Sequence, residues 1–160
     1  MTIMYRFVRH AGFAAALIAG LALSACANKA TDSLASAGMA TPGSQQDFVV
    51  NVGDRVFFES DSSELTPQSI ATLDKQAQWL GRYNRYAFTI EGHADERGTR
   101  EYNIALGARR AQAVRDYLTS RGVESHRMRT ISYGKERPVA LGSNEEAWAR
   151  NRRAVTIVLN

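Results

Sequence analysis

The strongest constraint on the fold is the alternation of short apolar runs with amphipathic stretches in residues 47–160. Four apolar runs, rich in β-branched and aromatic residues, predict strands at 56–58, 86–91, 128–133 and 154–159. Helical spacing of apolar residues, or helix-capping residues, predicts helices at 66–81, 99–120 and 145–150. In the second helix the side chains expected to face the core are Tyr102, Leu106, Val114, Tyr117 and Leu118. The order β-α-β-α-β-α-β predicts an α+β fold, a two-layer sandwich with the helices packed on a mixed four-stranded sheet.

The first 25 residues predict a secretory signal peptide. Arg6 and Arg9 supply a basic start, and residues 11–23 form an almost unbroken apolar run. As a helix this run would extend over roughly 20 Å, less than the ~30 Å hydrocarbon core of a bilayer. The alternative is a buried core helix, but the glycines in the run and its basic flank disfavour that structure.

The chain has a single cysteine, Cys26, which directly follows this segment. One cysteine allows no intrachain disulfide and excludes zinc sites built on two or more thiolates. Residues 23–26, Leu-Ser-Ala-Cys, resemble the bacterial lipobox. The resemblance implies cleavage before Cys26 and its acylation, and two or more acyl chains anchor a protein stably to a membrane. With Ala27 next in the chain, it also implies an outer-membrane location facing the periplasm.

Residues 26–46 predict an acylated cysteine followed by a flexible tether. Small and polar residues dominate residues 27–46, and large apolar side chains are too few to offset the entropy of ordering. Fully extended, about 20 residues would reach roughly 70 Å. We therefore expect a tether that carries a folded domain, residues 47–160, from a lipid leaflet toward a layer beneath it.

The net charge gives no indication of nucleic-acid binding. The chain has 20 Lys and Arg against 16 Asp and Glu, a formal charge of +4. Loss of the two arginines in residues 1–25 leaves 18 against 16, a charge of +2. An excess this small and this dispersed is not the basic patch that nucleic acids require.

The loop at residues 91–99, between a predicted strand and a predicted helix, contains the residues with recognisable binding chemistry. Gly92 and Gly98 let the backbone turn and approach a ligand closely. Asp95 offers a carboxylate to an ammonium group, and Arg109 and Arg110 on the following helix can bind a carboxylate bidentately. Together they predict a receptor for a zwitterionic amino-acid terminus. The alternative is an internal Asp–Arg pair on a solvated surface, which contributes ~0–1 kcal/mol.

Residues 48–160 resemble the OmpA-like domain family through four blocks in the family's order. The blocks are EGHADERGT (91–99), EYNIALGARRA (101–111), SYGKERP (132–138) and NRRAV (151–155). The lipobox and the tether belong to the same family pattern. The resemblance implies the sandwich fold and noncovalent binding of the diaminopimelate end of peptidoglycan stem peptides.

The resemblance also assigns roles to individual residues. Asp95, in the Gly-His-x-Asp motif, takes the diaminopimelate ammonium; Arg110 takes the carboxylate; Asp61, after the first strand, is a second ligand-binding aspartate. The remaining expected ligand-binding residues surround these three: Gly92, His93, Ala94, Asn103 and Leu106. The sequence departs from the family pattern at Glu59 and Ser60, where a glycine and an aromatic residue are common.

The partners that the resemblance implies are peptidoglycan, the outer membrane through the lipid anchor, and the Tol-system proteins TolB and TolA. In the family the TolB-binding surface overlaps the peptidoglycan site. A lipid anchor and wall affinity in one chain would link the outer membrane to the wall, support envelope integrity and assist constriction during cell division.

The sequence leaves two other classes of function to consider. A metal-dependent cell-wall hydrolase would use His93 and His126 with Glu91 or Glu96 as ligands. The chain has neither the His-x-x-x-His spacing of zinc proteases nor a nucleophile-elbow motif. We therefore expect no catalytic residue, no metal and no cofactor. A lipoprotein that acts mainly through its Tol partners remains an open alternative.

Overall fold

The helices and strands of the chain follow the predicted order. The computed structural model describes residues 40–159. The predicted signal peptide, the lipid attachment at Cys26 and the tether residues 27–39 lie outside the described residues. Ala40–Asn160 forms one compact unit with its own hydrophobic core.

All seven predicted elements are confirmed, with ends that differ by no more than two residues. The strands are β1 (Arg55–Phe57), β2 (Phe88–His93), β3 (Met128–Gly134) and β4 (Arg153–Val158). The helices are α3 (Gln45–Asp47), α4 (Pro67–Arg82), α5 (Arg100–Ser120) and α6 (Glu145–Asn151). The α3 turn, the π-helical segment Phe48–Gly53 that follows it and the 3-10 turn Ser125–Arg127 were not predicted.

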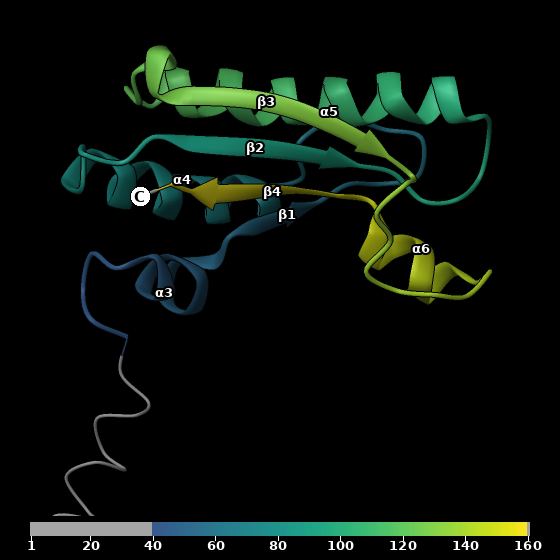
Figure 1. The fold of residues 1–160 in the computed structure, drawn as a ribbon, viewed down its shortest axis with the longest axis horizontal. Helices are drawn as coiled ribbons and strands as arrows, with labels where there is room; N and C mark the ends of the chain where they lie inside the picture. Colours follow the sequence, from purple (N-terminus) through teal and green to yellow (C-terminus); the bar gives the residue numbers. More distant parts are fainter. Residues whose placement is uncertain (1–39, 160) are drawn as a thin grey trace, which may run out of the picture. The chain divides into compact units, whose positions relative to one another are not determined.

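The four strands form the predicted mixed sheet, in the order β1-β4-β2-β3. β4 is antiparallel to both of its neighbours, whereas β2 and β3 are parallel. Both long helices, α4 and α5, lie on the same side of the sheet (Figure 1). The two-layer sandwich is therefore confirmed. Among the described residues, 40–159, none of the helices is long and apolar enough to cross a membrane.

Hydroxyl caps and apolar stripes account for the two long helices. The Thr66 hydroxyl accepts from the Ser69 backbone N–H at the start of α4, and the Thr99 hydroxyl caps α5 in the same way. The buried stripes meet the sheet in one core, which includes Leu73, Leu80, Phe88, Ile90, Val114 and Leu118. Tyr102 was expected to point into this core, but that prediction is wrong: it is 44% exposed, because the first turn of α5 projects beyond the sheet-covered core toward the loops.

Helix α5 packs directly against β2 at a pair of glycines. A Cβ atom on Gly92 would lie 1.8 Å from the carbonyl oxygen of Gly107, a distance that no packed structure allows. Gly92 therefore sets the spacing between sheet and helix, and with it the position of the loop that joins β2 to α5.

Residues 43–54 pack against the end of α4, ahead of the domain start expected at residue 47. The Asp47 carboxylate accepts from the Gly43 N–H and from the Trp79 indole N–H, both at 2.8 Å. The Tyr86 hydroxyl donates to the Gly43 carbonyl at 2.7 Å, and the ring of Phe48 packs edge-on against Trp79. α3, which contains Asp47, lies at the end of the sheet away from α6 (Figure 1).

Candidate ligand-binding pocket

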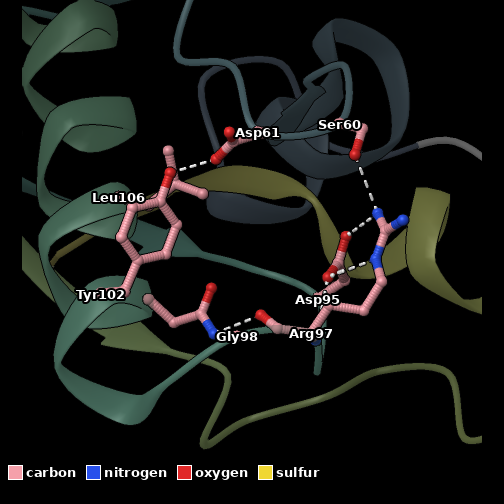
Figure 2. A pocket seen from close by; sticks show the side chains of 8 residues that line it. Ser60, Asp61, Asp95, Arg97, Gly98, Tyr102 and Leu106 are labelled. Carbon is pink, nitrogen blue, oxygen red and sulfur yellow. Dashed lines mark hydrogen bonds and ion pairs between the residues drawn. The ribbon is translucent and has the colours of Figure 1, made fainter.

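A pocket of about 370 Å³ opens at the end of the sheet where β2 ends. The β1–α4 loop, the β2–α5 loop and the first turns of α5 enclose it (Figure 2). Its lining residues are Ser60, Asp61, Asp95, Arg97, Gly98, Tyr102, Asn103 and Leu106. Two carboxylates and a guanidinium group thus face one open space that also has an aromatic and an aliphatic wall.

Asp95 lies at the base of this charged group and is only 7% exposed. Arg97 donates to it three times: Nη2 to Oδ2 at 2.6 Å, and Nε and the backbone N–H to Oδ1, both at 3.1 Å. Arg152 Nη1 lies 3.5 Å from Oδ2. Burial alone would raise the pKa of the Asp95 carboxyl, but the hydrogen bonds and charge of Arg97 outweigh burial and hold that pKa below its ordinary value. The carboxylate is therefore ionised and already partnered.

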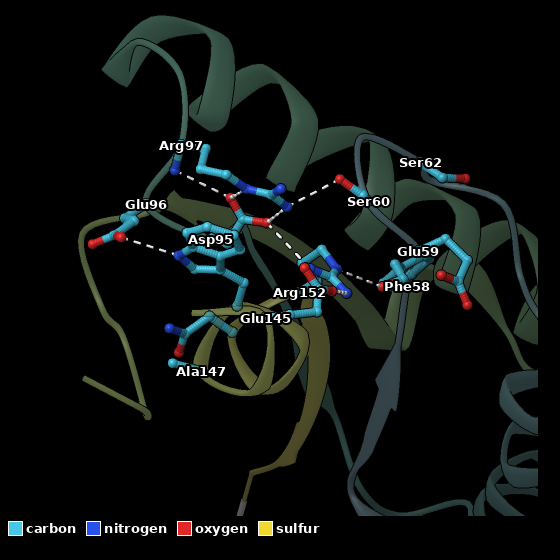
Figure 3. Close-up of polar contacts among 12 residues, drawn as sticks. Phe58, Glu59, Ser60, Ser62, Asp95, Glu96, Arg97, Glu145, Ala147 and Arg152 are labelled. Atoms are coloured by element: carbon cyan, nitrogen blue, oxygen red, sulfur yellow. Dashed lines mark hydrogen bonds and ion pairs between the residues drawn. The ribbon is translucent and has the colours of Figure 1, made fainter. Parts of the chain in front are cut away.

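Arg97 connects three parts of the pocket wall. Its Nη2 also donates to the Ser60 hydroxyl at 3.0 Å (Figure 3). Its guanidinium carbon lies 4.2 Å from the centre of the Trp148 ring. Its side chain is nevertheless 40% exposed. Arg97 is thus the solvent-facing partner of Asp95.

Asp61 faces the same space from the opposite wall (Figure 2). Its backbone has a positive φ of 56°, a left-handed conformation that aspartate tolerates better than most residues. The Tyr102 hydroxyl donates to Asp61 Oδ1, and this hydrogen bond raises the pKa of Tyr102. Asp61 is therefore held in place by the residue that was expected in the core.

Arg110 is fully buried and supports the pocket from inside the domain. It donates to three backbone carbonyl oxygens, those of Ser62 at 2.8 Å, His93 at 2.8 Å and Glu59 at 3.1 Å. Burial lowers the pKa of Arg110 to about 10, so the guanidinium remains charged at neutral pH. These bonds hold the β1–α4 loop against the end of β2, and the side chain is not part of the pocket wall.

His93 and Ala94 also lie inside the domain. The His93 side chain is 1% exposed and stacks on Tyr133, with ring centres 5.7 Å apart. Burial, and then the charges of Arg153 and Arg137, lower the pKa of His93 to about 4. The ring is therefore neutral at pH 7, and Glu91 Oε2, although 3.4 Å from Nε2, forms no ion pair with it. Ala94 donates its backbone N–H to the Gly134 carbonyl at 2.8 Å.

The metal-ligand set of the hydrolase alternative is not brought together. His93 ends β2, whereas His126 directly precedes β3. Because β2 and β3 are parallel, the two histidines lie at opposite ends of the sheet. Across residues 40–159, no group of three or more His, Cys, Asp or Glu side chains is arranged to hold a metal ion.

Helix α6 and the loop before it brace the pocket loop from the outside (Figure 3). The Trp148 indole donates to Glu96 Oε1 at 3.0 Å. Lys135 Nζ donates to the carbonyls of Glu96 and Gly98, at 3.1 and 2.7 Å. Buried Arg152 donates to the Phe58 carbonyl at 3.0 Å, which ties α6 to the end of β1. These contacts tie the pocket loop to α6 and to the loop before it, and leave Arg97 and Asp61 as the exposed charged residues of the pocket wall.

The structure separates the predicted ligand-binding residues into two groups. Four line the pocket: Asp61, Asp95, Asn103 and Leu106. Four lie inside the domain, where they hold the loops and the helix–sheet spacing: Gly92, His93, Ala94 and Arg110. Gly98, which was expected to let the backbone approach a ligand, also lines the pocket, and three lining residues were not predicted: Ser60, Arg97 and Tyr102. Of these, Arg97 had a signal in the sequence, since it follows Asp95 by two residues in a loop closed by a glycine.

Comparison with known proteins places these observations in a family. The sequence model of the OmpA family matches residues 57–152. A peptidoglycan-associated lipoprotein of Rhizobium meliloti (strain 1021) is 62% identical over 149 residues, which span 89% of this chain and 85% of the relative. A protein of the same name from Brucella suis biovar 1 (strain 1330) is 60% identical over 151 residues, 91% of this chain and 90% of the relative.

Solved structures agree with the sandwich fold. The crystal structure of the peptidoglycan-associated lipoprotein from Burkholderia pseudomallei has a TM-score of 0.68 and 41% identity, and covers 72% of this chain and 100% of that one. The crystal structure of the C-terminal domain of Helicobacter pylori MotB has a TM-score of 0.63, and the match covers 67% of this chain and 84% of the MotB chain. Its sequence is 22% identical, so this similarity is evidence for the fold alone.

Proposed function

This chain belongs to the OmpA family, and from that premise we propose that it is a non-catalytic outer-membrane lipoprotein that binds peptidoglycan noncovalently. The observation that carries the proposal is the pocket itself. It places the carboxylates of Asp61 and Asp95 and the guanidinium of Arg97 around one space of about 370 Å³. Relatives with 60% or more identity over most of the chain are named for association with peptidoglycan.

The ligand in this proposal is the diaminopimelate side chain of the stem peptide, which ends in an ammonium and a carboxylate on one carbon. Asp95 and Asp61 supply acceptors for the ammonium, while Tyr102 and Leu106 contact the aliphatic part. Asn103, whose amide donates to the Arg97 carbonyl at 2.7 Å, fixes the loop around the ligand. Arg110 lies behind the pocket wall and supports ligand binding through its positive charge and through its hydrogen bonds to three backbone carbonyls.

The same proposal explains why weak binding is enough. A small ligand held by one charge pair and a few hydrogen bonds binds at roughly micromolar strength. Many copies, each anchored in the membrane by acylated Cys26, would together hold a polymeric wall firmly. The protein would then exchange between the wall and Tol-Pal partners of the TolB and TolA type. This exchange would bring the connection between membrane and wall to the place where the envelope constricts.

Co-sedimentation with purified sacculi tests the proposal, with the chain from Ala27 to Asn160 so that no lipid is attached. The wild type should sediment with the sacculi. Asp95→Asn should lose at least about 30-fold in affinity, because removing one member of a desolvated charge pair weakens binding by ~2 kcal/mol or more. The matched control is Asp116→Asn, a change at an exposed aspartate of α5, which should bind like the wild type. If the wild type stays in the supernatant, wall binding is wrong and the Tol partners become the main candidate.

A further inference from the structure

A groove of about 230 Å³ lies between α4 and the π-helical segment Phe48–Gly53. It shares no lining residue with the pocket around Asp95. Lys75, Trp79 and Arg82 lie along one face of α4, because their spacing of four and three positions matches the helical repeat. The groove therefore has an indole between two cations. Its lining residues are Asn51, Val52, Lys75, Gln78, Trp79 and Arg82.

The surface around this groove is basic. Lys75 and Arg82 are exposed, and neither forms an ion pair with another described residue. The acidic side chains nearby are already engaged: Asp74 pairs with Arg121 at 2.9 Å, and Asp47 is buried. Without residues 1–25 the chain has 18 Lys and Arg against 16 Asp and Glu, so the positive charge at the groove is a local excess.

Two apolar side chains are exposed in the segment that forms the other wall of the groove. Val49 and Val50 are 46% and 57% exposed. The segment itself is fixed, because Phe48 is buried and packs edge-on against Trp79. Apolar side chains next to basic ones suit the surface of an anionic membrane, where the cations meet lipid phosphates and the apolar groups enter the headgroup layer.

The place of the groove in the chain favours a membrane over other acidic partners. Gly43 is held by Asp47 and by the Tyr86 hydroxyl, so the chain enters the domain at α3, at the end of the sheet away from α6 (Figure 1). From Cys26, the proposed acylation site, to Ala40 is 14 residues. Even fully extended, 14 residues reach no more than about 50 Å. A lipid surface is therefore always close to this domain, at an effective concentration that makes weak contacts sufficient.

We propose that Lys75, Arg82 and the two exposed valines form a docking surface for anionic phospholipids of the membrane in which Cys26 is anchored. The proposal takes the lipid anchor from the proposed function and adds a second, reversible contact with the membrane. α4 begins next to the loop that lines the pocket and ends at Arg82, roughly 24 Å further along its axis. A domain docked in this way directs the pocket away from the lipid and toward the wall.

Sedimentation with phospholipid vesicles tests the docking surface, with the chain from Ala27 to Asn160 so that no lipid is attached. The vesicles contain phosphatidylcholine alone or an equal mixture of phosphatidylcholine and phosphatidylglycerol. The wild type should bind the anionic vesicles at least about tenfold more strongly. Changing both Lys75 and Arg82 to glutamine should weaken this binding at least about tenfold, since each cation near an anionic surface contributes about fivefold. Changing both valines to serine should weaken it as well.

The matched control changes Arg100 and Arg150 to glutamine. It removes the same charge from exposed positions near the other end of the sheet, beyond the distance at which salt screens a docked membrane. This variant should bind anionic vesicles within about twofold of the wild type. Equal losses in the two arginine and lysine variants overturn the proposal, because binding would then follow net charge and not this surface.

A wild type that binds neither kind of vesicle, or both equally, overturns the proposal too. Sacculus binding is measured in parallel and separates this result from the proposed function. The Lys75 and Arg82 variant should sediment with sacculi like the wild type, because neither residue lines the pocket. If the wild type binds anionic vesicles but not sacculi, wall binding is wrong and the docking surface stands.

Discussion

Asp47 and Asp95 are two nearly buried aspartates at opposite ends of the domain, 9% and 7% exposed. Each carboxylate accepts several short hydrogen bonds, and each has a pKa below its ordinary value. Their donors differ. Asp47 is bound by the Trp79 indole, the Asn51 amide and the Gly43 backbone, all neutral and at 2.8 Å. Asp95 is bound by arginine.

The difference shows how one residue type serves two purposes. Neutral donors held by packed rings and backbone leave nothing that an incoming ion could replace, so Asp47 is a permanent anchor for the start of the domain. A charged donor that is 40% exposed can be exchanged for another cation, so Asp95 is suited to binding. The two residues are exposed to a similar extent, so the identity and exposure of the donor decide the role.

The largest expected effect is on stability, from Asp47→Ala. This change leaves the Trp79 indole and the Gly43 N–H without an acceptor, so we expect a loss of about 3 kcal/mol in the free energy of unfolding. Asp95→Asn should lose about 1 kcal/mol or less, since water can take over the exposed Arg97. Urea denaturation at neutral pH measures both. Equal losses for the two variants would contradict the proposed difference between the sites.

Acid should destabilise the domain in two stages. The pKa of His93 is about 4 in the folded protein and 6.5 ordinarily, so the folded state favours the neutral ring. The contribution of His93 to the free energy of unfolding is therefore complete above pH 6.5 and declines as the pH falls to about 4. The pKa values of Asp47 and Asp95 lie below 3.8, so their contribution declines only at lower pH. Urea midpoints measured against pH should show both stages. His93→Asn should flatten the first stage, and Asp47→Asn or Asp95→Asn should reduce the second.

The smallest expected effect on stability is that of Arg97→Gln. An ion pair with one exposed partner contributes little, so the free energy of unfolding should change by about 0.5 kcal/mol or less. Any difference should shrink further in about 0.5 M NaCl, because salt screens exposed charges. A salt-independent loss of about 2 kcal/mol would show that Arg97 is a fixed structural partner like those of Asp47, and would contradict the difference between the two sites.

Local patterns predicted most of the fold. Caps such as Thr66 and Thr99 and the apolar spacing of α4 and α5 involve residues within a few positions of one another, so the sequence displays them directly. The start of the domain was not visible in this way. Residues 43–47 are small or polar, and they are ordered by Trp79 and Tyr86, which lie more than 30 positions away.

The site was predicted in part for the same reason. Asp95 could be named from its chemistry and its place between a strand and a helix. Tyr102 could not, because helical spacing alone assigned it to the core, and its partner Asp61 is 41 positions away in the sequence.

The sequence by itself determined the elements, their order, the loop that contains the site and the carboxylate at its centre, because these depend on neighbouring residues. Only the tertiary structure decided which arginine meets that carboxylate. Arg97 and Arg110 carry the same charge, but the loop turns Arg97 back onto Asp95, while α5 directs Arg110 into the interior, among three carbonyls. That choice depends on how distant segments pack, which no local pattern records.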